Sequence, residues 1–251
     1  MAERDAIIKY MDALLEVDDF KDYIPKGLQI EGRPEIKKIA TGVSVCMEIL
    51  EAAAEWGADM VLVHHGMFWD RSDPVLRGHQ KARVKFLLEH DMTLAGYHLP
   101  LDAHGEVGNN ILFARAMGFE NIEPFGLYNG KMIGWKGTFP PNAIENFVDR
   151  ARAFYGTDPR AFLYGPKEIT SAAVISGGAW DEFMLAVRED IDCYVTGNAD
   201  EPVYHQAREE KKHFLSFGHY ATERVGVRRL GEVVAEEFGV EVRFFDVDNP
   251  L

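Results

Sequence analysis

Short apolar runs alternate with amphipathic helical segments along nearly the whole chain, and this alternation limits the fold more than any other feature. After a first helix near residues 6–15, strands are expected over 36–45, 59–63, 92–97, 132–139, 172–176, 193–196, 214–217 and 240–247. Helices are expected over 47–56, 80–90, 109–117, 142–155, 180–189, 202–209 and 222–238. Strands that alternate with helices in this way predict an α/β fold with helices on the faces of a sheet.

Two five-residue motifs indicate that the second half of the chain repeats the first. His98-Leu99-Pro100-Leu101-Asp102 and His219-Tyr220-Ala221-Thr222-Glu223 share the form His-x-x-x-carboxylate, and 219 − 98 = 121. The helices that follow them are expected to end at Gly118 and Gly239, again 121 residues apart. We therefore expect two similarly wound α/β lobes, possible products of a duplication.

The turn-rich segment 118–137 contains Asn121, Pro124, Gly126, Asn129 and Gly130 and is the expected boundary between these lobes. The sequence thus predicts a first lobe over 1–125 and a second over 126–251. The last strand, 240–247, could pack back on the first lobe.

Composition excludes several classes of protein. With 41 acidic residues against 27 Lys plus Arg, the net charge is −14, which argues against general binding to a nucleic-acid backbone. No apolar run approaches the ~18 residues of a membrane helix, and the polar start Met1-Ala2-Glu3-Arg4-Asp5 does not resemble a signal peptide. Cys46 and Cys193 are too few for a disulfide scaffold or a thiolate zinc finger. A cytoplasmic globular protein is expected.

Histidines and carboxylates follow four of the expected strands. His64-His65 follow Val61-Leu62-Val63, and the two His-x-x-x-carboxylate motifs and Asn198-Ala199-Asp200 follow other strands. Each could be structural when taken alone: one histidine in the core and one at the surface, or a carboxylate that stabilises a helix N-terminus. In a helical turn His219 and Glu223 would share a face, whereas Pro100 makes regular helix less favourable between His98 and Asp102.

Taken together, these groups favour a metal site at the carboxyl ends of the strands, where open α/β sheets bind ligands. Imidazole and carboxylate without thiolate suit Zn, Mn, Fe or Ni. Five or six such ligands exceed the three that a catalytic zinc needs, which indicates two divalent ions bridged by a carboxylate. We expect the site in the cleft between the two lobes.

The three motifs also carry a family resemblance that spans essentially the whole chain. His64-His65-Gly66, Tyr97 to His104 with Gly108-Asn109-Asn110, and Gly218 to Glu223 occur in the order and spacing of the Nif-three-like proteins. That family of dinuclear-metal hexamers is often labelled GTP cyclohydrolase 1 type 2 homologues. Gly27 to Gly32 and Thr41-Gly42-Val43 are similar to its opening segments.

The resemblance implies metal ligands at His64, His65, Asp102, His219 and Glu223, with Glu223 as the bridge, and a homohexamer. In that pattern His98 is not a principal ligand. Two departures stand out: Lys26 replaces the usual Asn before Gly27, and Ser44 replaces the usual Asp after Val43. Neither is expected to touch a ligand, although Ser44 could alter the pocket floor.

A metal-dependent hydrolase acting on a nucleotide-like substrate is the leading functional hypothesis. His98, and less directly His104 and His205, could shuttle a proton. The resemblance implies attack at C8 of the guanine ring of GTP, but the chain has no phosphate-binding Gly-x-x-x-x-Gly-Lys-Ser/Thr motif. Arg224, Arg228 and Arg229 could bind phosphates or form a solvated helix face. The alternatives are a two-metal phosphoesterase and a non-catalytic metal-binding or adaptor protein.

Overall fold

The expected alternation of strands and helices is present in residues 1–70 and 72–251, which the computed structural model describes. Contacts between residues divide the chain into two units. Unit 1 consists of Met1–Leu101 and Gly226–Asp248, and unit 2 of Asp102–Val225 and Asn249–Leu251. Both units contain a mixed sheet and helices, so the α/β class predicted from the sequence is confirmed.

This division differs from the one expected at residue 125. The turn-rich segment 118–137 does not separate the units, because it forms most of the hairpin of β7 (Glu120–Tyr128) and β8 (Lys131–Ala143) inside unit 2. Turn residues here mark a hairpin rather than a domain linker.

A five-stranded sheet in the order β13-β4-β5-β6-β2 forms the centre of unit 1. Its first four strands are parallel, and β2 pairs antiparallel with β6. The strands are β2 (Gly27–Ile30), β4 (Lys38–Ser44), β5 (Met60–His65), β6 (Thr93–Gly96) and β13 (Glu241–Phe244). The short strands β1 (Ala2–Glu3) and β3 (Glu35–Ile36) pair with each other beside it. The C-terminal strand thus lies in the sheet of unit 1.

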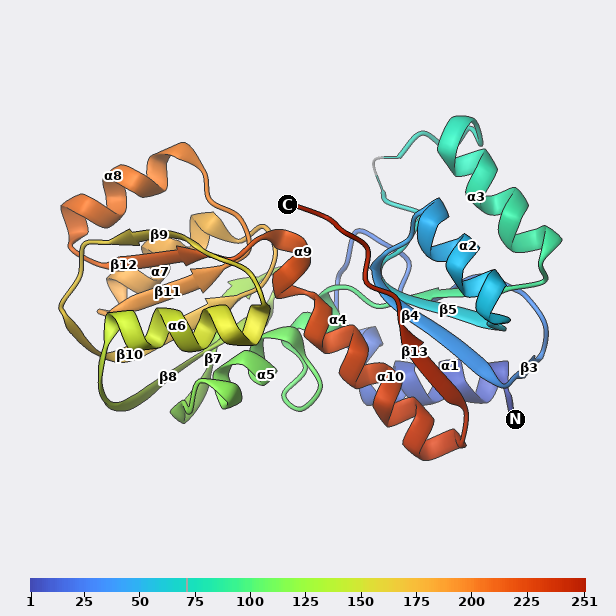
Figure 1. Ribbon diagram of the computed structural model, residues 1–251, viewed down its shortest axis with the longest axis horizontal. Helices are drawn as coiled ribbons and strands as arrows, with labels where there is room; N and C mark the ends of the chain where they lie inside the picture. The colour runs from blue at the N-terminus through green and yellow to red at the C-terminus, as the bar shows by residue number, and fades with distance from the viewer. Residues whose placement is uncertain (71) are drawn as a thin grey trace. The chain divides into compact units, whose positions relative to one another are not determined.

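Helices cover both faces of this sheet. α2 (Met47–Trp56) and α3 (Gly78–Glu89) lie on one face, and α1 (Arg4–Leu14) and α10 (Arg224–Phe238) lie on the other (Figure 1). α10 approaches the sheet closely at Gly231, where a Cβ atom would lie 2.8 Å from side-chain atoms of Thr41 and Val242. Only glycine therefore permits this packing distance.

The sheet of unit 2 has six strands in the order β7-β8-β10-β11-β12-β9. β10 (Glu168–Ile175), β11 (Cys193–Thr196) and β12 (His213–Ser216) are parallel, and β9 (Arg160–Leu163) pairs antiparallel with β12. Unit 1 likewise has parallel β4, β5 and β6 followed by antiparallel β2. The strands β4-β5-β6-β2 of unit 1 and β10-β11-β12-β9 of unit 2 therefore share one arrangement, in which three parallel strands are followed by one antiparallel strand.

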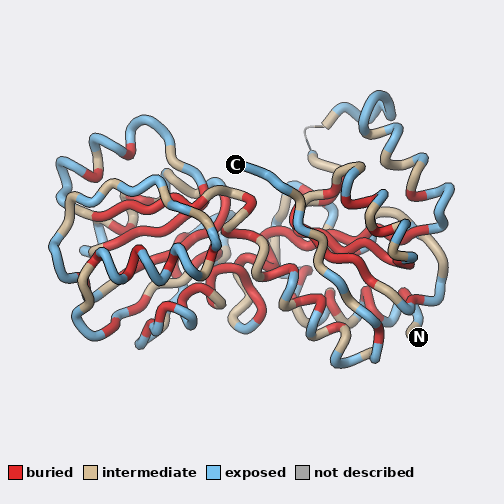
Figure 2. The backbone as a smooth tube through the Cα atoms, viewed as in Figure 1, coloured by how far each residue is buried: buried red, intermediate tan, exposed pale blue. Residues whose placement is uncertain are grey.

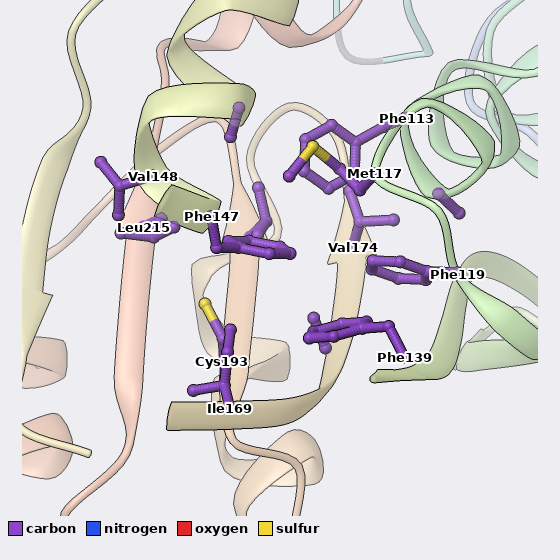
Figure 3. Packing of buried hydrophobic residues seen from close by; sticks show 14 of the residues in the cluster. Phe113, Met117, Phe119, Phe139, Phe147, Val148, Ile169, Val174, Cys193 and Leu215 are labelled. Carbon is purple, nitrogen blue, oxygen red and sulfur yellow. The ribbon is translucent and has the colours of Figure 1, made fainter. Parts of the chain in front are cut away.

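Alternate residues of the parallel strands form two separate cores in unit 2. Val174, Val195 and Leu215 belong to the core beneath α5 (Asn109–Ala116) and α6 (Ile144–Tyr155). Figure 3 shows Val174 and Leu215 with the rings of Phe113, Phe119, Phe139 and Phe147. On the other face, Tyr194 and Phe214 contact Phe183 of α7 (Phe183–Arg188). β11 and β12 are accordingly buried along their whole length, and β10 is buried from Ala172 to Ile175 (Figure 2).

The remaining helices connect the strands. They are η1 (Val17–Asp19), α4 (Leu99–Ala103), η2 (Trp180–Glu182), α8 (Glu201–Glu210) and α9 (His219–Thr222). Most expected elements are present within a few residues: the helix expected over 222–238 is α10, which begins at Arg224 after the separate short helix α9. Among the described residues, no helix has both the length and the apolar composition needed to cross a membrane.

The two cysteines occupy different environments. Cys193 is fully buried in β11, and burial raises the pKa of its thiol well above the usual value. Cys46 is partly exposed and precedes the first turn of α2. Neither forms a disulfide.

His213 gives unit 2 a stability that depends on pH. It is buried, its Nε2–H donates to the Pro166 carbonyl at 2.7 Å, and desolvation lowers its pKa below 6.5. Because the unfolded state then binds a proton more readily than the folded state, the contribution of His213 to the free energy of unfolding is fully present above pH ~6.5. It is lost as the pH falls toward the folded pKa.

We predict that His213→Gln, which removes the titrating ring, flattens the loss of Tm between pH 7 and pH 5.5. Differential scanning calorimetry of the variant and of His79→Gln, an exposed control, measures this. The assignment is wrong if the Tm of both variants falls with pH as steeply as that of the unmodified protein.

Candidate metal centre

His64 and His65 are the last two residues of β5 rather than residues that follow it. The strand is held on one side by β4, where Ser44 is opposite His65, and on the other by β6. Although neighbouring strand residues usually point to opposite faces, the two imidazole rings are 4.7 Å apart. His64 is fully buried, and His65 is partly exposed.

A backbone carbonyl determines which nitrogen of His64 is basic. His64 Nδ1 lies 2.8 Å from the carbonyl oxygen of Tyr97, which can only accept, so Nδ1 carries the hydrogen and the lone pair is on Nε2. Tyr97 is itself held by its hydroxyl, which donates to Asp12 Oδ1 at 2.7 Å. Metal-binding histidines commonly use the second nitrogen in this way.

His98 has an acidic partner that the sequence did not indicate. Its Nδ1 lies 3.0 Å from Asp22 Oδ1, and Asp22 Oδ2 accepts the backbone N–H of Leu99 at 3.0 Å. Both side chains are almost completely buried, at 7% exposed for His98 and 0% for Asp22. The carboxylate therefore orients the ring with Nε2 as its basic atom.

The three histidines of unit 1 form one cluster. Each of His64, His65 and His98 offers a nitrogen within 4.8 Å of the other two, and the aromatic rings of Tyr23 and Trp69 lie against His98. Since Zn–N bonds measure ~2.0–2.1 Å, two nitrogens bound to one ion are themselves only a few ångströms apart. The spacing of the cluster is compatible with a divalent ion.

Ser44 corrects an expectation from the sequence, which placed it away from the ligands. Its Oγ is 2.9 Å from His65 Nδ1. A hydroxyl thus occupies the position from which a carboxylate would strengthen the basicity of Nε2, the other nitrogen of His65.

Unit 2 holds the three other predicted ligands. His219 Nε2 lies 3.2 Å from Glu223 Oε1, so the expected convergence of residues i and i+4 is present. Carboxylate oxygens of Asp102 and Glu223 lie within 4.8 Å of each other. Two buried carboxylates this close repel each other unless a cation or a proton lies nearby, so the donor set fits a divalent cation.

Asp102 is fixed by two neutral donors. Its Oδ1 accepts hydrogen bonds from Asn109 Nδ2 and from Ser176 Oγ, both at 2.8 Å. Asn110 links the same region together, because it donates to the carbonyls of Asp102 and Ile133 and accepts the N–H of Ser176. Pro100 does not prevent α4 from forming, because it lies in the first turn, where proline is tolerated.

Glycine is required at position 177, beside Glu223. Gly177 has φ +67°, and a Cβ atom there would lie 2.3 Å from Glu223 Oε1 and 3.1 Å from His219 Nε2. Its N–H donates to Thr222 Oγ1 at 3.0 Å, which ties the loop after β10 to α9. Any other side chain would displace these two predicted ligands.

Several candidates have structural roles instead. His104 Nδ1 accepts the N–H groups of Glu106 and Val107 at 3.1 Å, and the exposed His205 lies 3.5 Å from Glu201. Asp200 caps α8 by accepting the N–H of Glu201 at 2.7 Å.

The three arginines after Glu223 are held by protein groups. Arg224 donates to the carbonyl of Tyr155, and Arg228 lies 3.6 Å from Asp246. Arg229 pairs with Glu232 and Glu236. These contacts favour the interpretation of a structural helix face.

The family model described as Duf34/NIF3 (NGG1p interacting factor 3) matches residues 2–250. The chain belongs to this family. A relative from Haemophilus influenzae, named GTP cyclohydrolase 1 type 2 homolog, is 39% identical over 237 residues, 94% of each chain. One of the same name from Neisseria meningitidis serogroup B is 43% identical over 248 residues, 97% of each chain. The solved structure of protein ybgI, titled as of unknown function, covers 100% of both chains with a TM-score of 0.93 and 35% identity. The resemblance stated from the motifs is therefore confirmed.

We predict that Ser44→Asp strengthens metal binding and that Ser44→Ala weakens it. A carboxylate at this position increases the basicity of His65, and partners of this kind change metal affinity by about 10–100-fold. Competition with a chromogenic chelator measures the affinity for Zn²⁺ and Co²⁺. Equal affinities for the two variants would show that this hydrogen bond does not act on the ligand.

We also predict that Ser176→Ala lowers metal affinity by about tenfold or more, because Asp102 loses one of the two donors that orient it. Ser171→Ala is the matched control on β10, the strand that Ser176 follows, and there the lost partner is Asp192 at 3.2 Å. Metal affinity is measured as above, and the Tm of the metal-free proteins shows any general destabilisation. Similar losses of affinity in both variants would contradict a specific effect on Asp102.

Proposed function

We propose that His64, His65, Asp102, His219 and Glu223 together bind two divalent metal ions, with Glu223 as the bridge. The observation that carries the proposal is the close approach of the buried Asp102 and Glu223 carboxylates in unit 2, with His219 3.2 Å from Glu223. In unit 1, the carbonyl of Tyr97 leaves Nε2 as the basic nitrogen of His64. Nitrogen and oxygen donors without thiolate suit Zn, Mn, Fe or Ni.

We further propose that the protein is a metal-dependent hydrolase of a nucleotide-like substrate, as the names of the relatives suggest. A pair of divalent ions supplies Lewis acidity and makes hydroxide available near neutral pH. His98, oriented by Asp22, is suited to hold a proton at Nε2, and the burial of both groups limits the access of water to their hydrogen bond. For GTP, attack of one water at C8 of guanine would open the imidazole ring to a formamide, and hydrolysis of that formamide by a second water would release the carbon as formate.

A homohexamer in the cytoplasm is the form in which we propose that the protein acts. Six chains of 28.3 kDa give an assembly of about 170 kDa, which light scattering after size exclusion measures directly.

Elemental analysis and a product assay test the metal proposal and the hydrolase proposal separately. Protein purified without a histidine tag and loaded with each metal is expected to hold two ions per chain. Glu223→Gln is expected to lose both, since an amide offers one neutral oxygen for bridging. Glu232→Gln, an exposed control paired with Arg229, is expected to keep both.

Formate released from GTP by the loaded protein, and not by Glu223→Gln, would support the cyclohydrolase reaction. Release of inorganic phosphate without formate would instead support the phosphoesterase hypothesis. Two bound ions without turnover of any nucleotide would favour a non-catalytic metal-binding protein.

A further inference from the structure

α2 and α3 lie side by side on one face of the unit 1 sheet and carry rows of opposite charge (Figure 1). The acidic row consists of Glu48, Glu51 and Glu55, which are all exposed and share one side of α2 because they are three and four residues apart. The basic row consists of Lys81 and Lys85, which are exposed and four residues apart on α3. One face of unit 1 therefore presents both signs of charge in parallel rows.

The two rows do not neutralise each other within the chain. In the part of the chain that the structure describes, the three carboxylates of the acidic row and the ammonium group of Lys81 take part in no ion pair. Lys85 Nζ lies 3.5 Å from Glu89 Oε1 on its own helix. Like charges three or four residues apart destabilise a helix slightly, and a facing surface of opposite charge would offset that effect.

Apolar side chains accompany the basic row. Leu88 is 60% exposed on the same side of α3 as Lys81 and Lys85, and Val75 and Leu76, just before this helix, are 57% and 49% exposed. Exposed ion pairs contribute little to association by themselves, because solvent and salt screen them. Burial of these apolar groups would supply the hydrophobic part of a contact, and the charged rows would set its orientation.

A second copy of the chain matches this face because the two rows are complementary to each other. α2 connects β4 to β5 and α3 connects β5 to β6, and these strands are parallel, so both helices point in the same direction. A two-fold axis that runs along the helices and between them places α2 of each copy on α3 of the other. Each acidic row then faces a basic row, although chains of net charge −14 repel each other in general.

We propose that this face of unit 1 is a two-fold contact between copies of the chain, with the acidic row of each copy against the basic row of its partner. The inference concerns assembly rather than the metal centre. It goes beyond the proposed homohexamer, because it names the contacting surface and would hold equally for a dimer.

Reversal of each row tests the contact. Glu51→Lys/Glu55→Lys reverses the acidic row, and Lys81→Glu/Lys85→Glu reverses the basic row. Either variant alone brings like charges together across the two-fold axis, so we expect light scattering after size exclusion to give half the mass of the unmodified assembly. An equimolar mixture of the two variants has opposite charges in both halves of the contact and is expected to regain the full mass.

Glu145→Lys/Glu209→Lys is the control, because it makes the same change of charge at exposed positions of α6 and α8 in unit 2. We expect it to keep the full mass, and the Tm of every variant shows whether its fold is retained. Full mass in either row variant, or half mass in their mixture, would overturn the proposal. A monomeric unmodified protein would overturn both this contact and the homohexamer, whereas a dimer would overturn the homohexamer alone.

Carbodiimide cross-linking tests the unmodified protein without any substitution. The reagent joins a lysine amine to a carboxylate where the two groups are in contact, and assembly from isotope-labelled and unlabelled chains identifies the links between copies. We expect mixed-isotope peptides that join the acidic row to the basic row. Their absence, or mixed-isotope links at other surfaces only, would overturn the proposal.

Discussion

Parallel pairing of β5 with β6 brings the carbonyl of Tyr97 to 2.8 Å from His64 Nδ1, and the chemistry of unit 1 depends on that hydrogen bond. Because the carbonyl accepts and cannot donate, the buried ring keeps its lone pair on Nε2. The tyrosine hydroxyl reaches Asp12 on α1, so a helix far from the strand ends also restrains this ring. A neutral backbone carbonyl thus leaves Nε2 of this buried histidine available to a cation.

Unit 2 prepares its acidic residues by a different means. Asp102 receives two neutral hydrogen bonds on one oxygen, and Gly177 leaves the space that Glu223 and His219 occupy. Neutral donors hold a carboxylate in place without cancelling its charge, so its attraction for a metal is retained. The loops after β10 and β12 are therefore determined by packing around the carboxylates as much as by their own turn preferences.

Sequence reasoning was most successful where local spacing determines geometry. The i, i+4 relation of His219 and Glu223 and the apolar strand before His64 both follow from short-range periodicity. Asp22 could not be predicted, because its contact with His98 joins residues 76 positions apart and no motif marks it. Ser176 lies 74 residues from Asp102, and Ser44 was identified only as a departure from a family pattern. The boundary near residue 125 was misplaced because a hairpin and a linker use the same turn residues.

The unequal burial of the two cysteines makes the protein suitable for site-specific labelling without mutagenesis. Thiol reagents attack the thiolate, which the high pKa of Cys193 and its full burial keep scarce and inaccessible in the folded chain. Cys46, partly exposed and two residues beyond Ser44, would receive the label. A fluorophore or spin label there would report on the end of β4 that contacts His65, and a paramagnetic ion bound nearby would broaden or quench its signal. The native sequence therefore provides its own reporter of metal binding.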